Sequence, residues 1–301
     1  MWIVATLLFL VLRIVPGDPA ELLLSGGGVA PSPAAVAELR ERLGLTRPVF
    51  AQYAEFLGRI VRADLGVSLL DQHAVGEEVA RRLPRTLELI AAASVLAVAI
   101  GLPLGVFAAV RRGRAGDRIL STLASFNLSM PVFVLGTLLV LVFAQTLRWV
   151  PAGGFVAWSQ DPRGHLVYLL MPAVTIAVGL STVIFRMTRA TVLETLERDW
   201  VRTARAKGLA PGAVLRRHVV RNSMGPVLTV LALHMGTLLG GTVLVEYVFN
   251  WPGLSGYLVR AVEQRDYPEV QGIVLVICAI FVLLNLAVDL LYAVLDPRVR
   301  H

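Results

Sequence analysis

Residues 198–226 combine arginine side chains with helical spacing, a pattern suited to binding a partner protein rather than to covalent chemistry. From just before this stretch into its first part, apolar residues recur at steps of three and four, which predicts one apolar helical face. They are Leu193, Leu196, Trp200 and Ala204. The opposite face is charged, through Glu194, Glu197, Arg198, Arg202 and Arg205. The spacing leaves two interpretations open: an element gripped by another protein, or a solvated basic loop that only sets membrane topology.

The same stretch contains its own turn signals. Gly208 is predicted to end the first helix, because glycine adopts the left-handed conformation at a helix C-terminus without steric cost. Pro211 fits the first turn of a second, short helix, with Val214, Leu215 and Val219 on its inner side. A rigid two-helix elbow between two apolar runs is therefore expected.

The chain lacks residue patterns for catalysis or for binding ATP. It has no Ser/His/Asp grouping, no paired carboxylates in apolar surroundings and no HExxH motif. The sole lysine, Lys207, is followed by Gly208, so no phosphate-binding loop is present, and an ATPase would be a separate polypeptide. The single cysteine, Cys278, is expected to pack in an apolar run. None of the five histidines pairs with a cysteine or another histidine at ligand spacing, so no metal site is predicted within the chain.

The composition is that of a membrane protein. The 301 residues are 56% hydrophobic and only 16% charged, too apolar for a soluble domain with a solvated surface. The net charge of +7 comes mainly from arginines clustered between apolar runs, which is typical of cytoplasmic loops rather than of a nucleic-acid-binding surface. The chain is therefore expected to lie in a lipid membrane, and nucleic acid is not an expected partner.

Six apolar segments are predicted to span the membrane, at 1–15, 86–110, 119–146, 165–185, 226–248 and 270–295. The first is short and interrupted by Arg13, and we expect that the chain begins late relative to a fuller first helix. Basic clusters at 111–118, 186–221 and 298–300 all fall on one side, which places both termini in the cytoplasm. The predicted fold class is an all-α integral membrane protein of six transmembrane helices, with an extracytoplasmic helical insertion between helices 1 and 2.

The insertion itself, residues 20–85, is predicted to hold three short helices, at 33–43, 48–63 and 75–83, the last stopping before Pro84. The middle helix would carry one apolar face, made of Val49, Tyr53, Phe56, Leu57 and Ile60. The segment either caps the bundle or docks a soluble substrate-binding protein.

A few polar residues fall deep in the predicted spans. Asn127 and Ser129 lie beside Pro131, which suggests either a cavity wall or a hydrogen bond between helices. His234 precedes a Gly236-x-x-x-Gly240 motif and is either a pore group or a packed histidine. With Asn285 in the last span, these residues form the predicted translocation path. The spans are otherwise nearly free of carboxylates. Secondary transporters often use such groups for proton coupling, so this composition argues against a secondary transporter, which stays open as a second function class.

The segment RTARAKGL followed by RHVVRN resembles the cytoplasmic loop of binding-protein-dependent ABC importer permeases, in the B-type subunits of the dipeptide/oligopeptide/nickel family. The general signature of that family is Glu-Ala-Ala, three residues and then Gly. The matching positions here are Arg202, Thr203, Ala204 and Gly208, and the glutamate is absent. Further matches lie in the family's order at PGDP (16–19), DLGVS (64–68), NLSMPVF (127–133) and LDPRVR (295–300).

The resemblance implies a type I ABC importer permease in a bacterial cytoplasmic (inner) membrane, forming half of a translocation pathway. The implied regions are a first transmembrane helix (1–15), an extracytoplasmic segment (16–85) and a five-helix core (86–301), with a coupling loop at 191–224. Contact with the ATPase is assigned to Arg202, Thr203, Ala204, Arg205, Ala206, Lys207, Gly208 and Leu209.

The implied partners are a second homologous permease, two ABC ATPase subunits or domains, and an extracytoplasmic substrate-binding protein. No cofactor is expected in this chain, since ATP and Mg would be bound by the ATPases. Di- or oligopeptides are the first expected cargo, with nickel complexes or glutathione as alternatives.

Overall fold

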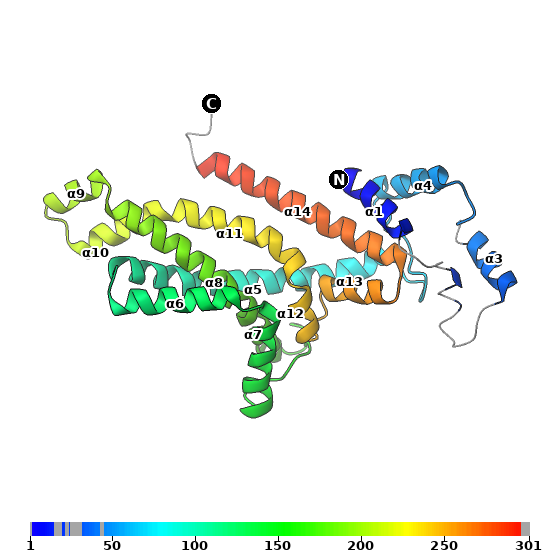
Figure 1. The fold of residues 1–301 in the computed structure, drawn as a ribbon, viewed down its shortest axis with the longest axis horizontal. Coiled ribbons are helices and arrows are strands. Elements are labelled where there is room, and N and C mark those ends of the chain that lie inside the picture. Colours follow the sequence, from blue (N-terminus) through cyan, green and yellow to red (C-terminus); the bar gives the residue numbers. More distant parts are fainter. Residues whose placement is uncertain (1, 15–19, 22–23, 25–31, 43–44, 296–301) are drawn as a thin grey trace. The chain divides into compact units, whose positions relative to one another are not determined.

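The computed structural model describes residues 2–14, 20–21, 24, 32–42 and 45–295, and within them the chain is all-α (Figure 1). The PGDP motif at 16–19 and almost all of LDPRVR at 295–300 lie outside the described residues. The chain divides into two compact units, residues 1–84 with 257–280 and residues 85–256 with 281–301. The described helices are α1 (Trp2–Ile14), α3 (Pro33–Arg42), α4 (Val49–Val61), α5 (Val75–Val110), α6 (Ala115–Ser129), α7 (Val132–Leu139), η1 (Val140–Thr146), α8 (Pro162–Leu196), α9 (Asp199–Ala206), α10 (Pro211–Ala213), η2 (Val214–Val220), α11 (Arg221–Gly241), α12 (Val243–Val248), α13 (Leu254–Glu263) and α14 (Tyr267–Leu295).

Four of the described helices are long and apolar enough to cross a membrane. They are α5, α8, the continuous helix Pro211–Gly241, and Tyr267–Leu286 of α14. The bent pair formed by α6 and Val132–Thr146 makes a fifth if it counts as one span. The helix α1 has 13 residues, fewer than the roughly 20 that a span needs. The multi-span membrane architecture is thus confirmed, and the count of six stays a prediction.

The segment predicted as one span at 119–146 is interrupted by a bend, and whether it crosses the membrane as one span stays a prediction. The chain bends by 102° between α6 and α7, as Figure 1 shows. Met130 is extended, with φ −93° and ψ 123°, because a residue before proline is disfavoured in the helical region. Pro131 then precedes the first residue of α7.

At two other places, Pro84 and Pro226, the helix continues through the proline. The helix boundaries predicted at these two residues were wrong. The helix expected at 75–83 continues through Pro84 into the span as α5. Pro226, the predicted start of the fifth span, lies inside α11, which ends at Gly241 before the separate helix α12. An interior proline removes one backbone hydrogen bond and bends a helix, but packed neighbours can hold it together.

The core of the second unit forms around α8, which crosses closely over α5. Ala93, Ala97, Ala177 and Ile184 are among the residues buried in this contact. A Cβ atom at Gly101 would lie 2.5 Å from the carbonyl oxygen of Ser181. A Cβ atom at Gly105 would lie 2.7 Å from the Cβ atom of Thr188. The two glycines therefore allow the helix backbones to approach as closely as they do.

The first unit has a separate small core, made of Ala5, Phe9, Phe56 and Leu275. Tyr53, Leu57 and Ile60 pack against it, which confirms most of the apolar face predicted for α4. Val49 does not belong to that face, since 54% of it is exposed at the start of the helix.

One buried carboxylate fixes the segment that follows α11. Glu246 is 1% exposed, and its Oε1 accepts a hydrogen bond from Thr86 Oγ1 at 2.7 Å. Its Oε2 accepts one from the backbone N–H of Gly256 at 2.8 Å. Thr86 Oγ1 also accepts from the N–H of Leu254, so the carboxylate joins α5 to residues 246–256. A Cβ atom at Gly253 would lie 2.3 Å from Glu246 Oε1, so a larger residue there would displace the carboxylate from its hydrogen bonds.

We expect Glu246→Ala to lower the thermal midpoint of the detergent-solubilised chain sharply. The substitution leaves the Thr86 hydroxyl and the Gly256 N–H buried without their acceptor, at a cost of about 1–3 kcal/mol for each group. Glu246→Gln retains an acceptor oxygen and should lose less stability. The control is Glu263→Ala at an exposed position. Equal midpoints for Glu246→Ala and Glu263→Ala would contradict the anchoring role.

Candidate coupling site

The arginine-rich elbow begins with a sharp break after α8. This helix ends at Leu196, and the extended Arg198, with φ −69° and ψ 144°, turns the chain into α9. The apolar face predicted from Leu193 to Ala204 is therefore not one continuous helical face, although Leu193, Leu196 and Ala204 pack in the same apolar cluster as predicted. Trp200 is 42% exposed, whereas Val201 and Ala204 are the buried residues of α9.

The inner side of the elbow packs into a cluster of its own. Val201 and Ala204 of α9 meet Val214 and Val219 of η2, together with Ala109 and Val192. Leu215 packs against the same cluster, as predicted for the second helix. The elbow is therefore a folded element rather than a loose loop, because both of its arms bury apolar side chains against one another.

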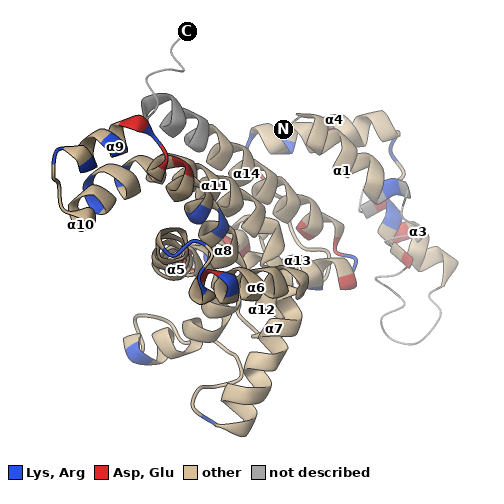
Figure 2. Cartoon of the chain, turned by 60° about the vertical axis from the view of Figure 1, so that its left-hand side comes forward, with Lys and Arg blue, Asp and Glu red and all other residues tan. Residues whose placement is uncertain are grey.

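The outer side of α9 is exposed and basic. Of the eight predicted contact residues, only Ala204 is buried. Exposed are Arg202, Thr203, Arg205, Ala206, Lys207, Gly208 and Leu209. Figure 2 shows basic residues on α9 and in the helical segment that follows α10, with acidic residues near the junction of α8 and α9. The Thr203 hydroxyl is used within the helix, where it donates to the carbonyl of Asp199 at 3.0 Å.

The ion pairs of this face are solvated. Arg202 lies 3.6 Å from Asp199, with side chains that are 73% and 96% exposed. Arg112 pairs with Glu197 at 3.1 Å, also in the open. Exposed pairs of this kind contribute only about 0–1 kcal/mol, so a partner can replace them at little cost.

The turn lies where the sequence predicted it. Gly208 has φ +76°, and its N–H donates to the carbonyl of Arg205 at 3.0 Å. No atom lies within 4 Å of the place where its Cβ would be, so the need for glycine comes from the backbone conformation and not from crowding. Pro211 occupies the first turn of α10, also as predicted.

The second arm of the elbow is longer than predicted. α10 continues through the π-helical segment η2 into α11, which gives one helix over Pro211–Gly241. The elbow is therefore continuous, through its second arm, with an apolar, membrane-length helix.

An ion pair missed by the sequence analysis lies near the elbow. Arg189 of α8 donates to Asp117 of α6 through Nε at 2.6 Å and Nη2 at 2.9 Å. Asp117 is 3% exposed and also accepts from the N–H of Gly113. The sequence signal that could have indicated this ion pair was Asp117 itself, the lone acidic residue in the basic cluster 111–118.

The predicted path residues are spread over separate contacts. Asn127 Nδ2 donates to the carbonyl of Val178 at 2.9 Å and to Thr182 Oγ1 at 2.6 Å. Ser129 is exposed and donates to the carbonyl of Ser125. The half-buried His234 contacts the carbonyl of Val230 in its own helix through Nδ1 at 3.0 Å.

Asn285 lies near α11, with its Oδ1 3.8 Å from the place of a Gly236 Cβ. In the described part of the chain, no hydrogen bond joins any two of Asn127, Ser129, His234 and Asn285. Their role as a path stays a prediction.

Two family profiles match the chain. Residues 101–301 match the binding-protein-dependent transport system inner membrane component, and residues 1–90 match the N-terminal region of such membrane components. The chain is 39% identical over 301 residues to the glutathione transport system permease protein GsiC of Escherichia coli O6:H1, covering 100% of this chain and 95% of that protein. The identity to the same-named protein of Salmonella typhi is 39% over 299 residues, covering 99% and 94%.

Solved structures of importers share the fold. An inward-facing MetNI methionine ABC transporter aligns with a TM-score of 0.58 at 18% identity, covering 72% of this chain and 96% of that one. An amino acid ABC transporter with histidines aligns with a TM-score of 0.51 at 17% identity, covering 74% and 95%. The matched family profile over residues 101–301 and the relative at 39% identity identify the chain as a member of the inner-membrane components of binding-protein-dependent transport systems, the permease subunits of ABC importers.

Proposed function

We propose that α9 and the start of α10 receive a partner ATPase and convert its ATP-driven closure into movement of the membrane helices. The observation that carries this proposal is the exposed basic face of α9, held by a buried inner face and joined through Gly208 to the continuous helix Pro211–Gly241. Force applied to the elbow reaches α8 at one end and α11 at the other. The pathway would switch between inward-facing and outward-facing states by movement of these helices.

The chain would form half of a pathway, completed by a second homologous permease. Two ATPase subunits or domains would dock on the cytoplasmic side, and an extracytoplasmic binding protein would deliver the cargo. Native mass spectrometry of the tagged chain, purified in mild detergent from its own membrane, tests this composition. Recovery with a second permease and ATPases supports the proposal, and a homo-oligomer recovered alone would favour a secondary transporter.

The proposed cargo is a short peptide, with glutathione as the first compound to test. The support is the relative named as a glutathione permease, which matches along the whole of this chain, together with glutathione's own peptide bonds. The test measures uptake of labelled glutathione and of labelled dipeptides by the reconstituted importer. Each compound is also offered in competition with the other, which ranks the two cargoes. Uptake of neither compound by an importer that hydrolyses ATP would contradict the peptide-class assignment.

We expect Gly208→Val to uncouple ATP hydrolysis from uptake in the reconstituted importer. A left-handed conformation costs a residue with a Cβ atom about 1–2 kcal/mol, so the elbow angle would change although no atom clashes. Gly212→Val is the matched control, because a Cβ there is equally uncrowded and no positive φ is required. Normal uptake per ATP hydrolysed by Gly208→Val would contradict a coupling role for this turn.

We expect Arg205→Glu to weaken association with the ATPase roughly fivefold, since an exposed ion pair contributes up to about 1 kcal/mol. The measurement is co-purification at increasing ATPase concentration and at two salt concentrations. Arg163→Glu is the control, an exposed arginine at the opposite end of α8. Equal association of both variants with the ATPase would exclude direct docking at Arg205.

A further inference from the structure

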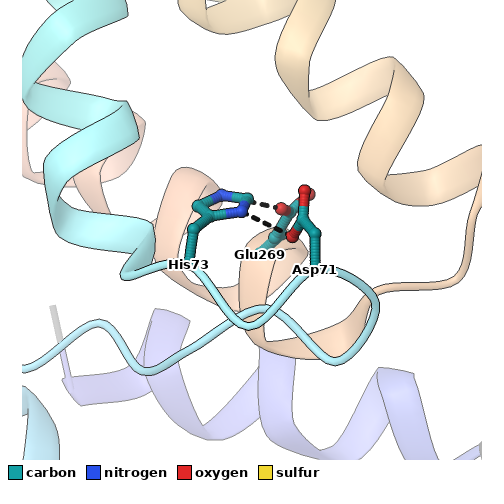
Figure 3. A group of neighbouring side chains, drawn as sticks. All are labelled: Asp71, His73 and Glu269. Carbon is teal, nitrogen blue, oxygen red and sulfur yellow. Dashed lines mark hydrogen bonds and ion pairs between the residues drawn. The ribbon is translucent and has the colours of Figure 1, made fainter.

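Three side chains that can ligate a metal meet in the first unit, as Figure 3 shows. His73 Nδ1 lies 2.5 Å from Asp71 Oδ1, and His73 Nε2 lies 3.2 Å from Glu269 Oε1. One ligand atom of each residue lies within 4.8 Å of those of the other two. Asp71 and His73 belong to the loop before α5, and Glu269 to the first turn of α14.

The backbone on both sides of the cluster is held in place by Asp266. Its Oδ2 accepts from Ser68 Oγ at 2.6 Å and from the N–H of Leu69 at 2.9 Å. Its Oδ1 accepts from the N–H of Glu269 at 3.3 Å. Asp266 is fully buried, so the loop and the start of α14 are fixed to each other before any ligand arrives.

A further oxygen lies beside the cluster. The Tyr257 hydroxyl is 2.9 Å from His73 Nε2.

The cluster lies on the wall of a cavity of about 400 Å³, whose lining includes Glu77, Glu78, Arg81 and Arg82. Both arginines pair with Glu78, at 3.2 and 2.5 Å, which offsets one of their two positive charges, and Arg260 also lines the cavity. Asp71 is 67% exposed in its side chain, whereas Glu269 is 5% exposed. A cation can thus enter from the cavity, and Asp71 has room to close on it.

We propose that Asp71, His73 and Glu269 bind a divalent transition-metal cation of the Zn²⁺ type. Two carboxylates balance the charge of the ion, and an imidazole nitrogen favours such metals over Mg²⁺ and Ca²⁺, which take oxygen ligands. Three protein ligands leave a fourth position of a tetrahedral ion for water or for a ligand from the cavity. The bound ion joins the loop before α5 to the start of α14.

The test is a Zn²⁺ titration of the full chain in detergent, purified with a tag that contains no histidine, followed by calorimetry. We expect one Zn²⁺ per chain at this site, undisturbed by excess Mg²⁺. Asp71→Asn and His73→Gln should each weaken that binding at least about tenfold. Glu77→Gln is the matched control, an exposed carboxylate on the same cavity but outside the cluster, and should bind as the wild type.

Unchanged Zn²⁺ affinity and stoichiometry in Asp71→Asn and His73→Gln would overturn the proposal, as would no Zn²⁺ binding by the wild type. Thermal midpoints measured without metal separate loss of ligand from loss of fold, since Asp71→Asn is nearly isosteric. X-ray absorption at the zinc edge gives an independent readout. One histidine with oxygen donors supports the assignment, and a sulfur donor would place the ion at Cys278 instead.

Discussion

The carboxylate of Glu246 is the interaction on which the second unit depends. A buried carboxylate costs several kcal/mol unless hydrogen bonds replace its lost water. Here the donors include Thr86 of α5 and the backbone of Gly256, and these two hydrogen bonds form only when α5 and residues 246–256 are both in place. Trp251 adds to the same junction by donating from Nε1 to the carbonyl of Arg85 at 3.1 Å. The Glu246 carboxylate therefore fixes one arrangement of α5 against residues 246–256.

Long apolar runs made the existence of the membrane helices predictable, but their ends depend on contacts far away in the sequence. Pro131 ends a helix, whereas Pro172 and Pro226 lie inside α8 and α11. A proline has the same local effect at all of these positions. Pro172 is buried in the core around α8, where packing supports the helix, whereas Pro226 and Pro131 are both exposed, so burial does not explain why only Pro131 ends a helix. Sequence spacing did not distinguish these prolines, and so the 102° bend after α6 was missed.

In the sites, too, features set by local sequence were predicted, whereas contacts between residues far apart in the sequence were not. Gly208 and Pro211 follow local rules of helix ends and starts, and both lie where the sequence placed them. The pair Asp117 and Arg189 joins residues 72 positions apart, and the contact between His73 and Tyr257 spans 184 positions. A search for histidines at short ligand spacing cannot find a cluster whose third member, Glu269, comes from another helix. Only the folded chain brings such side chains together.

Coupling requires that a push on the elbow moves helices rather than bending them. The close approach of α5 to α8 at Gly101 and Gly105, and the paired Asp117 and Arg189 between α6 and α8, hold these three helices against one another. The other arm contains the π-helical segment η2, whose wider turns are a common site of local adjustment in helices. Because η2 lies between α10 and α11, a change in the tilt of α11 can be absorbed there without breaking the continuous helix. In the proposed coupling, α8 would be the stiff arm of the elbow, and η2 would allow α11 to reorient while α9 keeps its contact with α8.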